Sequence, residues 1–428
     1  MPAMTRAVAR SLGGEAAIYL SASVASSAVP FLLMPLLTRW LGPADYGIVG
    51  SYVALNGVLA ALIGLSTHGL VSVVYYRDGP ERMPPQIGAA IGVCTAGTIA
   101  CLLLVWLSRD AVTEATSIPP PWLLITVLSA GGQFVITLTL AAFQTLRRPV
   151  LYALIQFGYS AILALVTLWL VGLNASGWEG RVLAQLSAAI SFSIVGLTIL
   201  SRMGQVVWRP SAWPMRKTLA FGLPLLPHAL SAIAMASIDR FVLNAQIGPV
   251  AVGQYFAAAQ LALLLVVVAT AINQAWLPWL YAHLSKNDVV SDRVVVKATL
   301  AMFATLLSSG LALSVMAQFI IPLVAGPGFE DAVVVLQILG PAAACSANYL
   351  FVASFLFYHE RTKLLSMLTM SAAILQIILS ISFGTWWGST GVAIAAAISA
   401  AYYWLATWIT ASIVHPLPWT GMWRADDS

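Results

Sequence analysis

Long apolar segments separated by short polar turns make up almost the whole chain. A helix needs about 20 consecutive apolar residues to cross the roughly 30 Å hydrocarbon core of a membrane. By that criterion we expect twelve membrane-spanning helices, at residues 15–38, 46–72, 86–108, 121–145, 149–172, 182–203, 219–243, 250–281, 295–317, 331–357, 364–385 and 389–412. The pattern therefore predicts an all-α membrane protein with about twelve transmembrane helices.

A short motif occurs once in each half of the chain. Residues 42–47 (GPADYG) and 248–253 (GPVAVG) share the frame G-P-x-x-x-G, and the two copies are 206 positions apart. In each half the motif joins two long apolar segments, as in transporters built from two internal repeats. We therefore predict two six-helix bundles related by an internal repeat, at residues 1–210 and 211–428, joined by the polar segment after the sixth span.

Composition supports a membrane location and excludes several other functions. Hydrophobic residues make up 60% of the chain and charged residues 8%, with a mean hydropathy of +0.90. Soluble domains carry about 25% charged residues. The three cysteines, Cys94, Cys101 and Cys345, all lie in apolar segments, and the chain lacks the Walker A, H-E-x-x-H, C-x-x-C and G-x-S-x-G patterns. We expect no catalytic site, no metal site and no cofactor.

The basic residues predict how the chain crosses the membrane. The isoelectric point near 9.2 does not indicate nucleic-acid binding, because the 20 basic residues lie mostly in short loops. If the N-terminus is cytoplasmic, Arg39, Arg109 and Arg181 lie outside and Arg240 lies within a span. The cytoplasmic side then holds the other sixteen: Arg6, Arg10, Arg77, Arg82, Arg147, Arg148, Arg202, Arg209, Arg216, Lys217, Lys286, Arg293, Lys297, Arg361, Lys363 and Arg424. Both termini are predicted to be cytoplasmic.

The seventh span contains an adjacent acid and base, Asp239 and Arg240. Each charge costs about 2.5–3.5 kcal/mol on insertion into a membrane, so it persists mainly beside a cavity, a ligand or a partner. Helical spacing places His228, Ser231 and Met235 on the same face as Asp239, whereas Arg240 is rotated away from it. Asp239 either faces a cavity or pairs with Arg240 or a neighbouring helix to stabilise the fold.

Other polar residues at membrane depth are candidates for substrate binding. His68 follows a row of glycines at seven-residue spacing and is predicted to lie on nearly the same helical face, either as a binding group or as a structural imidazole. Arg39 and Arg77 end the first two spans, where they either anchor helices or bind phosphate oxygens. Asn273 and Gln274 in the eighth span are uncharged groups that could hydrogen-bond a sugar.

Several segments in both halves carry a family resemblance. In the first half they are Pro30, residues 36–39 (LLTR), 41–43 (LGP) and 46–47 (YG); in the second they are residues 221–227 (FGLPLLP), 238–241 (IDRF), 253–255 (GQY) and Pro278. Together they resemble the Wzx-type polysaccharide and O-antigen flippases of the multidrug, oligosaccharidyl-lipid and polysaccharide exporter superfamily. The resemblance covers most of the chain and weakens after about Gly326.

The resemblance implies a specific function and cellular location. It implies a two-bundle transporter in the bacterial inner membrane that moves polyprenyl-diphosphate-linked oligosaccharides to the outer leaflet by alternating access, for synthesis of O-antigen, lipopolysaccharide or exopolysaccharide. It also implies a cavity position for Asp239 and Arg240. Its partners would be the lipid-linked oligosaccharide, the bilayer, a polysaccharide polymerase and a chain-length regulator, and no nucleic acid is expected.

Two alternatives from other classes remain open. A drug or organic-cation antiporter of the same superfamily would place carboxylates in the first bundle, where Glu15 is the one acid near the membrane in our span assignment. A membrane polymerase or ligase of surface polysaccharide would need acidic, His or Arg side chains in a sizeable extramembrane loop. Formation of a glycosidic bond by the purified chain would identify the enzyme.

The charge distribution yields a test of the topology. Single cysteines introduced at Asn174 and Ser389 should react with a membrane-impermeant thiol reagent in intact spheroplasts, because both positions are predicted to lie outside. A cysteine at Ser211 should react only after the membrane is opened. The opposite labelling pattern would contradict the predicted orientation.

Overall fold

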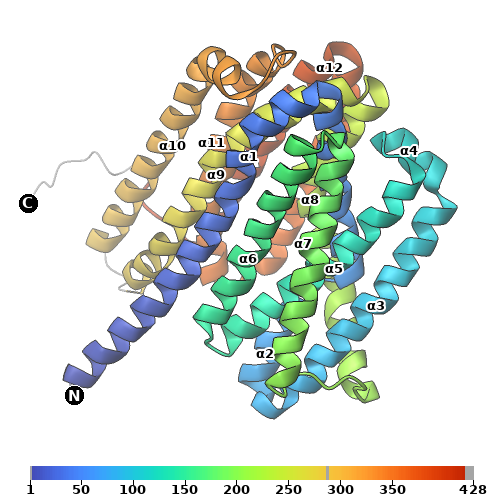
Figure 1. Cartoon of the computed structure of the whole chain (residues 1–428). Helices are drawn as coiled ribbons and strands as arrows, with labels where there is room; N and C mark the ends of the chain where they lie inside the picture. Colours follow the sequence, from blue (N-terminus) through green and yellow to red (C-terminus); the bar gives the residue numbers. More distant parts are fainter. Residues whose placement is uncertain (1, 286–288, 420–428) are drawn as a thin grey trace, which may run out of the picture. The chain divides into compact units, whose positions relative to one another are not determined.

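The computed structural model describes residues 2–285 and 289–419, and its described residues are helical with no strand (Figure 1). The elements of the first half are α1 (Pro2–Gly64), α2 (His68–Asp78), the 3-10 helix η1 (Pro80–Arg82), α3 (Met83–Leu107), α4 (Arg109–Thr116), α5 (Pro120–Thr145), α6 (Pro149–Thr167), the π-helical η2 (Leu168–Leu173) and α7 (Gly177–Arg202). They are followed by α8 (Ala212–Gln246), α9 (Pro249–Leu284), α10 (Val289–Val324), α11 (Ala332–Tyr358) and α12 (Thr362–Val414).

Ten helical segments among the described residues are long and apolar enough to cross a membrane. Two of them, Ser21–Asp78 with 58 residues and Thr362–Val414 with 53 residues, are long enough for two crossings each. A glycine with non-helical backbone divides each one, Gly42 (φ 68°, ψ 175°) in the first and Gly388 (φ 58°, ψ −136°) in the second. Counted in this way, the segments match the twelve predicted spans, and the all-α membrane fold is confirmed.

The chain divides into two compact units. The first comprises residues 1–233 and 248–253, and the second comprises residues 234–247 and 254–428. In the first unit α5 packs against α1, α3 and α7, while α6 packs against α1 and α7 (Figure 1). In the second unit α11 packs against both α10 and α12. The predicted boundary of the sequence repeat at residue 210 stays a prediction.

The two G-P-x-x-x-G motifs meet inside the first unit. The terminal glycine of each motif lies against the backbone of the other: a Cβ added to Gly47 would lie 1.8 Å from the carbonyl oxygen of Pro249, and one added to Gly253 would lie 1.9 Å from that of Pro43. The contact is thus reciprocal, as expected for two copies of one structural element packed around a local two-fold axis. Only glycine allows backbones to approach so closely.

The first glycine of each motif has a different role. Gly42 and Gly248 have φ values of 68° and 113°, in the region that residues with a Cβ rarely adopt, and both turn the chain between two helices. The proline that follows is suited to the first turn of the next helix, because its missing N–H would have no helical partner there. The motif therefore combines a turn with a close backbone contact.

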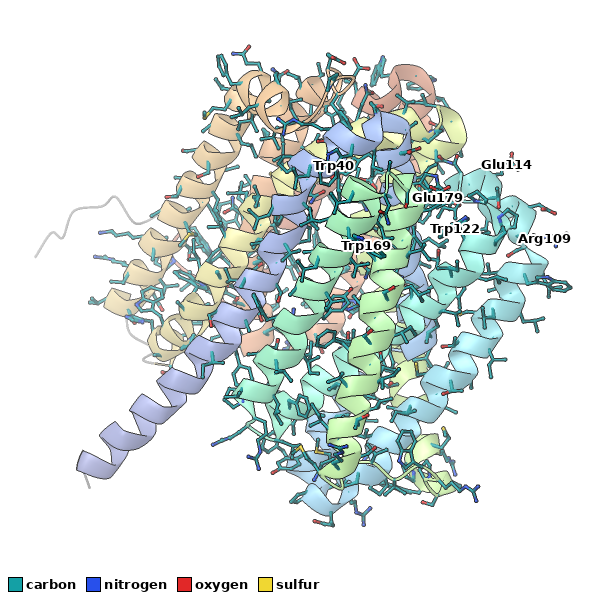
Figure 2. All side chains as sticks on the ribbon, viewed as in Figure 1. Trp40, Arg109, Glu114, Trp122, Trp169 and Glu179 are labelled. Atoms are coloured by element: carbon teal, nitrogen blue, oxygen red, sulfur yellow. The ribbon has the colours of Figure 1, made fainter. Side chains whose placement is uncertain are left out.

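Three tryptophans, Trp40, Trp122 and Trp169, lie toward one end of the first unit, as labelled in Figure 2. The same end carries the labelled charged residues Arg109, Glu114 and Glu179 (Figure 2). Trp122 also packs edge-on against Trp178, with ring centroids 5.2 Å apart. Tryptophans in such a position are typical of the membrane–water interface, where the ring is partly buried in lipid.

The segment after α7 packs against the first unit. The Val207 N–H donates to the carbonyl oxygen of Pro84 at 3.1 Å, and a Cβ added to Gly88 would lie 1.8 Å from the Val207 carbonyl oxygen. Within the same unit, the buried Gln86 amide donates to the Thr218 hydroxyl at 2.6 Å. These contacts hold the connection between α7 and α8 against α3.

The reciprocal glycine contact predicts a specific pattern of stability changes. Gly47→Ala and Gly253→Ala should each lower the melting temperature of the purified protein, because a new methyl group would overlap a carbonyl oxygen and overpacking costs about 1–3 kcal/mol. Gly69→Ala is the matched control, since Gly69 lies in α2 and has no neighbouring atom within 4 Å of an added Cβ. Equal melting temperatures for all three variants would contradict the close contact.

Candidate functional site

The second membrane span is interrupted between Gly64 and His68. Leu65 and Ser66 have positive φ values of 47° and 54°, so the helical backbone stops at α1 and restarts at α2. Such left-handed backbone costs about 1–2 kcal/mol per residue for amino acids with a Cβ. At membrane depth, irregular backbone is tolerated only where protein covers it or where it lines a cavity. The interruption therefore points to a site.

The helix breaks at its contact with α5. A Cβ added to Gly64 would lie 1.9 Å from a ring carbon of Phe134, so that side chain occupies the space beside the end of α1. His68 begins a new helix after the break, and it lines the same cavity as Gly57, one of the preceding glycines. A single-helix pattern could not predict the interruption.

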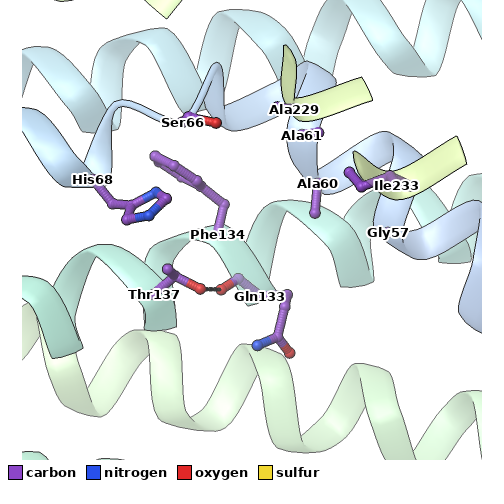
Figure 3. Close-up of a pocket in the computed structure, with 10 residues that line it drawn as sticks. All are labelled: Gly57, Ala60, Ala61, Ser66, His68, Gln133, Phe134, Thr137, Ala229 and Ile233. Carbon is purple, nitrogen blue, oxygen red and sulfur yellow. Dashed lines mark hydrogen bonds between the residues drawn. The ribbon is translucent and has the colours of Figure 1, made fainter. Parts of the chain in front are cut away.

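A cavity of about 300 Å3 adjoins the break. Figure 3 shows the imidazole of His68 beside the ring of Phe134, whose centroids are 6.4 Å apart. Its lining comprises Gly57, Ala60, Ala61, Ser66, His68, Gln133, Phe134, Thr137, Ala229 and Ile233, all within the first unit. The wall is therefore mostly small and apolar, with a few hydrogen-bonding groups.

Two polar side chains of α5 contribute to this lining. The Thr137 hydroxyl donates to the Gln133 carbonyl oxygen at 3.0 Å, one turn back in the same helix. The Gln133 side-chain amide points away from His68 and Phe134 (Figure 3), and its Oε1 is buried with no hydrogen-bond partner among the described residues. A buried amide oxygen without a partner is costly. A bound polar molecule could supply the missing hydrogen bond.

Asp239 is a second polar centre, located in the second unit. It lies in α8 and is only 6% exposed. Its Oδ1 accepts a hydrogen bond from the Arg240 backbone N–H at 2.8 Å, and the buried hydroxyl of Tyr255 donates to the same carboxylate. The carboxylate is thus held by neutral donors in α8 and α9.

The guanidinium of Arg240 does not form an ion pair with Asp239 within 4.0 Å in the described structure. Its Nη1 instead donates to the Ala236 carbonyl oxygen at 2.9 Å and to the Ser237 hydroxyl at 3.3 Å. The guanidinium carbon lies 5.0 Å from the ring centroid of Phe256, a distance typical of a cation–π contact. The two side chains therefore have different hydrogen-bond partners in the same unit, and their charges interact without a direct ion pair.

The remaining predicted site residues are spread over several helices. Arg39 is exposed and its Nη1 donates to the Pro35 carbonyl oxygen at 3.3 Å, while Arg77 is exposed and contacts Asp78 at 3.3 Å. His228 Nδ1 and Asn273 Oδ1 are buried and have no partner among the described residues, whereas Gln274 is exposed. Their predicted roles in binding stay predictions.

Tertiary structure adds residues that sequence reasoning missed. Gln133, Phe134 and Thr137 line the cavity, and Tyr255 holds Asp239. Gln133 and Thr137 are separated by one helical turn within an apolar span, a signal that could have drawn attention to them. In the described part of the chain, no three His, Cys, Asp or Glu side chains are grouped closely enough to hold a metal ion.

Comparison with known proteins gives consistent similarities. The sequence matches the family described as "polysaccharide biosynthesis protein" over residues 12–283. It is 24% identical over 369 residues to "Lsg locus putative protein 1" of Haemophilus influenzae, covering 85% of this chain and 89% of that one. It is also 24% identical over 392 residues to "Putative O-antigen transporter" of Escherichia coli strain K12, covering 88% and 91%.

The fold is similar to that of a solved transporter. The structure called "Lipid II flippase MurJ, inward closed conformation" superposes with a TM-score of 0.72 over 92% of this chain and 87% of that chain, at 15% sequence identity. At that identity the likeness concerns the fold.

The absence of a direct ion pair between Asp239 and Arg240 predicts a pattern of stability changes. Asp239→Ala should lower the free energy of unfolding by about 1–3 kcal/mol, because it leaves the buried Tyr255 hydroxyl without an acceptor. Arg240→Ala should have its own, smaller effect. In the double variant the loss should be at least as large as that of Asp239→Ala alone, as measured by thermal unfolding in detergent, because no ion pair leaves a partner uncompensated in the single variants. A double variant more stable than Asp239→Ala would instead indicate a direct ion pair.

Proposed function

Because this chain belongs to the polysaccharide biosynthesis protein family, we propose that it is a flippase for polyprenyl-diphosphate-linked oligosaccharides. It moves these units from the inner to the outer leaflet of the bacterial inner membrane, where they serve synthesis of a surface polysaccharide. The observation that carries the proposal is the interrupted second span, which lines a cavity with polar groups inside a membrane-spanning unit. The similarity of the fold to the structure called "Lipid II flippase MurJ" also supports the proposal.

The chemistry of the substrate explains why such a cavity is needed. A saccharide head group carries many hydroxyls, and each one transferred into hydrocarbon without a hydrogen-bond partner costs several kcal/mol. A protein lowers this barrier by providing polar partners across the membrane. The 300 Å3 cavity beside His68 is at the small end of ligand sites and suits one part of a head group.

Different residues suit different parts of the substrate. In the first unit, His68 and Gln133 offer hydrogen bonds to sugar hydroxyls, and His228 has a buried ring nitrogen available for the same purpose. In the second unit, Asn273 has a buried amide oxygen without a partner among the described residues. Arg39, Arg77 and Arg240 carry the forked donors that match diphosphate oxygens. Gln274 is exposed and can contribute a further amide. These assignments extend the family function to individual residues.

The site favours transport of a neutral or anionic head group over the two alternatives. An organic-cation antiporter would use a carboxylate to bind its substrate, and the residues that line the cavity of the first unit contain none. A polysaccharide polymerase or ligase would need a loop that positions acids and bases, whereas described connections such as residues 203–211 and 325–331 are short. Glycosidic bond formation by the purified chain would overturn the proposal.

The protein is a multi-pass membrane protein. We place it in the inner membrane, with both termini in the cytoplasm, on the strength of the charge distribution in its loops. A polymerase and a chain-length regulator that act on the flipped units are its proposed partners. Alternating access between inward- and outward-open states is the proposed mechanism.

The decisive variant is Asp239→Asn, which preserves the shape of the side chain but removes its charge. We expect it to slow flipping about tenfold or more, because hydrogen bonds to a charged group contribute about 1.5–3 kcal/mol. The assay uses proteoliposomes that contain a fluorescent polyprenyl-diphosphate disaccharide, and protection of the fluorophore from dithionite reports its leaflet.

The matched control is Asp110→Asn, since the Asp110 side chain is 91% exposed. It should flip the substrate at the wild-type rate, and both variants should reach wild-type abundance in the membrane. Normal flipping by Asp239→Asn would remove Asp239 from the mechanism. Absence of flipping by the wild-type protein would contradict the proposed function itself.

A further inference from the structure

Arg181 is a buried cation inside the first unit. The sequence places it at the outer end of the sixth span, and we expected it among the residues outside the membrane. In the structure it lies in the second turn of α7 and is only 8% exposed. A charged side chain so far removed from solvent requires compensation by its neighbours.

Its neighbours are mainly neutral oxygen-bearing side chains. Nη1 of Arg181 donates to Oε1 of Gln185 at 3.1 Å, and the Gln185 amide in turn donates to the hydroxyl of Tyr159. The phenol groups of Tyr52 and Tyr159 are close enough to interact electrostatically with the guanidinium. The cation therefore lies among hydroxyl and amide groups contributed by α1, α6 and α7.

A negative charge is missing from this environment. Among the described residues, no ion pair includes Arg181. Only one hydrogen bond from the guanidinium is seen among the described residues, although the group has five N–H donors. Arg181 as a whole is 8% exposed.

Unpartnered polar atoms lie on the adjoining helices. The Tyr52 and Ser129 hydroxyls hydrogen-bond one another at 2.8 Å and connect α1 to α5. One helical turn further along α1, the amide donor Nδ2 of Asn56 is buried without a partner in the described structure. Buried groups of this kind usually bind an ordered water or ion.

We propose that Arg181 binds a small monatomic anion of the chloride class. The guanidinium supplies the positive charge, and the hydroxyls of Tyr52 and Tyr159 can turn their hydrogens toward the anion in place of its hydration shell. A monatomic ion is smaller than a phosphate group and needs less room beside an arginine that is only 8% exposed. The bound anion neutralises the buried cation and ties α7 to α1 and α6. This site is independent of the proposed transport function.

Chloride titration of the purified wild-type protein tests the site. The melting temperature in detergent is measured at chloride concentrations from zero to about 200 mM, a range on the order of that needed to saturate a weak ion site. Gluconate replaces chloride so that the ionic strength stays constant. We expect a saturable rise on the order of 3 °C, because a ligand that binds only the folded protein stabilises it. Bromide should act similarly, and inorganic phosphate should not.

Two arginine variants assign the effect to the site. Arg181→Gln should lose the dependence on chloride, whereas Arg109→Gln should retain it, since Arg109 is about half exposed and contacts Asp110 at 3.7 Å. If Arg181→Gln does not fold, anomalous scattering from bromide in wild-type crystals locates the ion directly. Equal wild-type stability in chloride and gluconate, a stronger effect of phosphate, or bromide located away from Arg181 would each overturn the proposal.

Discussion

Hydrocarbon offers no hydrogen bonds, and this constraint determines most of the structure. A chain that crosses it must satisfy its backbone within helices, so nearly every long segment of this protein is helical. Non-helical backbone at membrane depth is therefore expected only where protein covers it or where it lines a cavity. The break at Leu65 and Ser66 is such a departure, and it coincides with a cavity whose lining includes His68 and Gln133.

The same constraint governs the buried charges. Asp239 and Arg181 are both less than a tenth exposed, and neither forms an ion pair within the described residues. Asp239 receives two hydrogen bonds from neutral donors, which stabilise a carboxylate well. Arg181 has one hydrogen bond to an amide oxygen, so its charge is less completely satisfied. This difference makes Arg181 a candidate for binding a small ion.

Close backbone packing supports the architecture around these sites. In a membrane, helices associate through contact between small residues and through interhelical hydrogen bonds, because lipid is as apolar as their side chains. Gly47 and Gly253 provide that contact reciprocally in the first unit. The repeated motif is thus explained by geometry: its first glycine permits a turn, and its last permits two backbones to touch.

Local properties of the sequence were enough to predict the number of spans, the fold class and the family resemblance. Span length and hydropathy depend on the amino-acid sequence alone, and the two G-P-x-x-x-G motifs can be read directly from it. Tertiary structure decided the rest. The break before His68 lies against Phe134 from another helix, and the partner of Asp239 is a tyrosine sixteen residues away across a turn. The sequence predicts that Arg181 lies outside the membrane beside the sixth span, yet the packing of α1, α5 and α6 against α7 buries it. Hydrophobic pattern reports where a residue lies along its own helix, whereas burial and hydrogen bonding depend on which helices surround it.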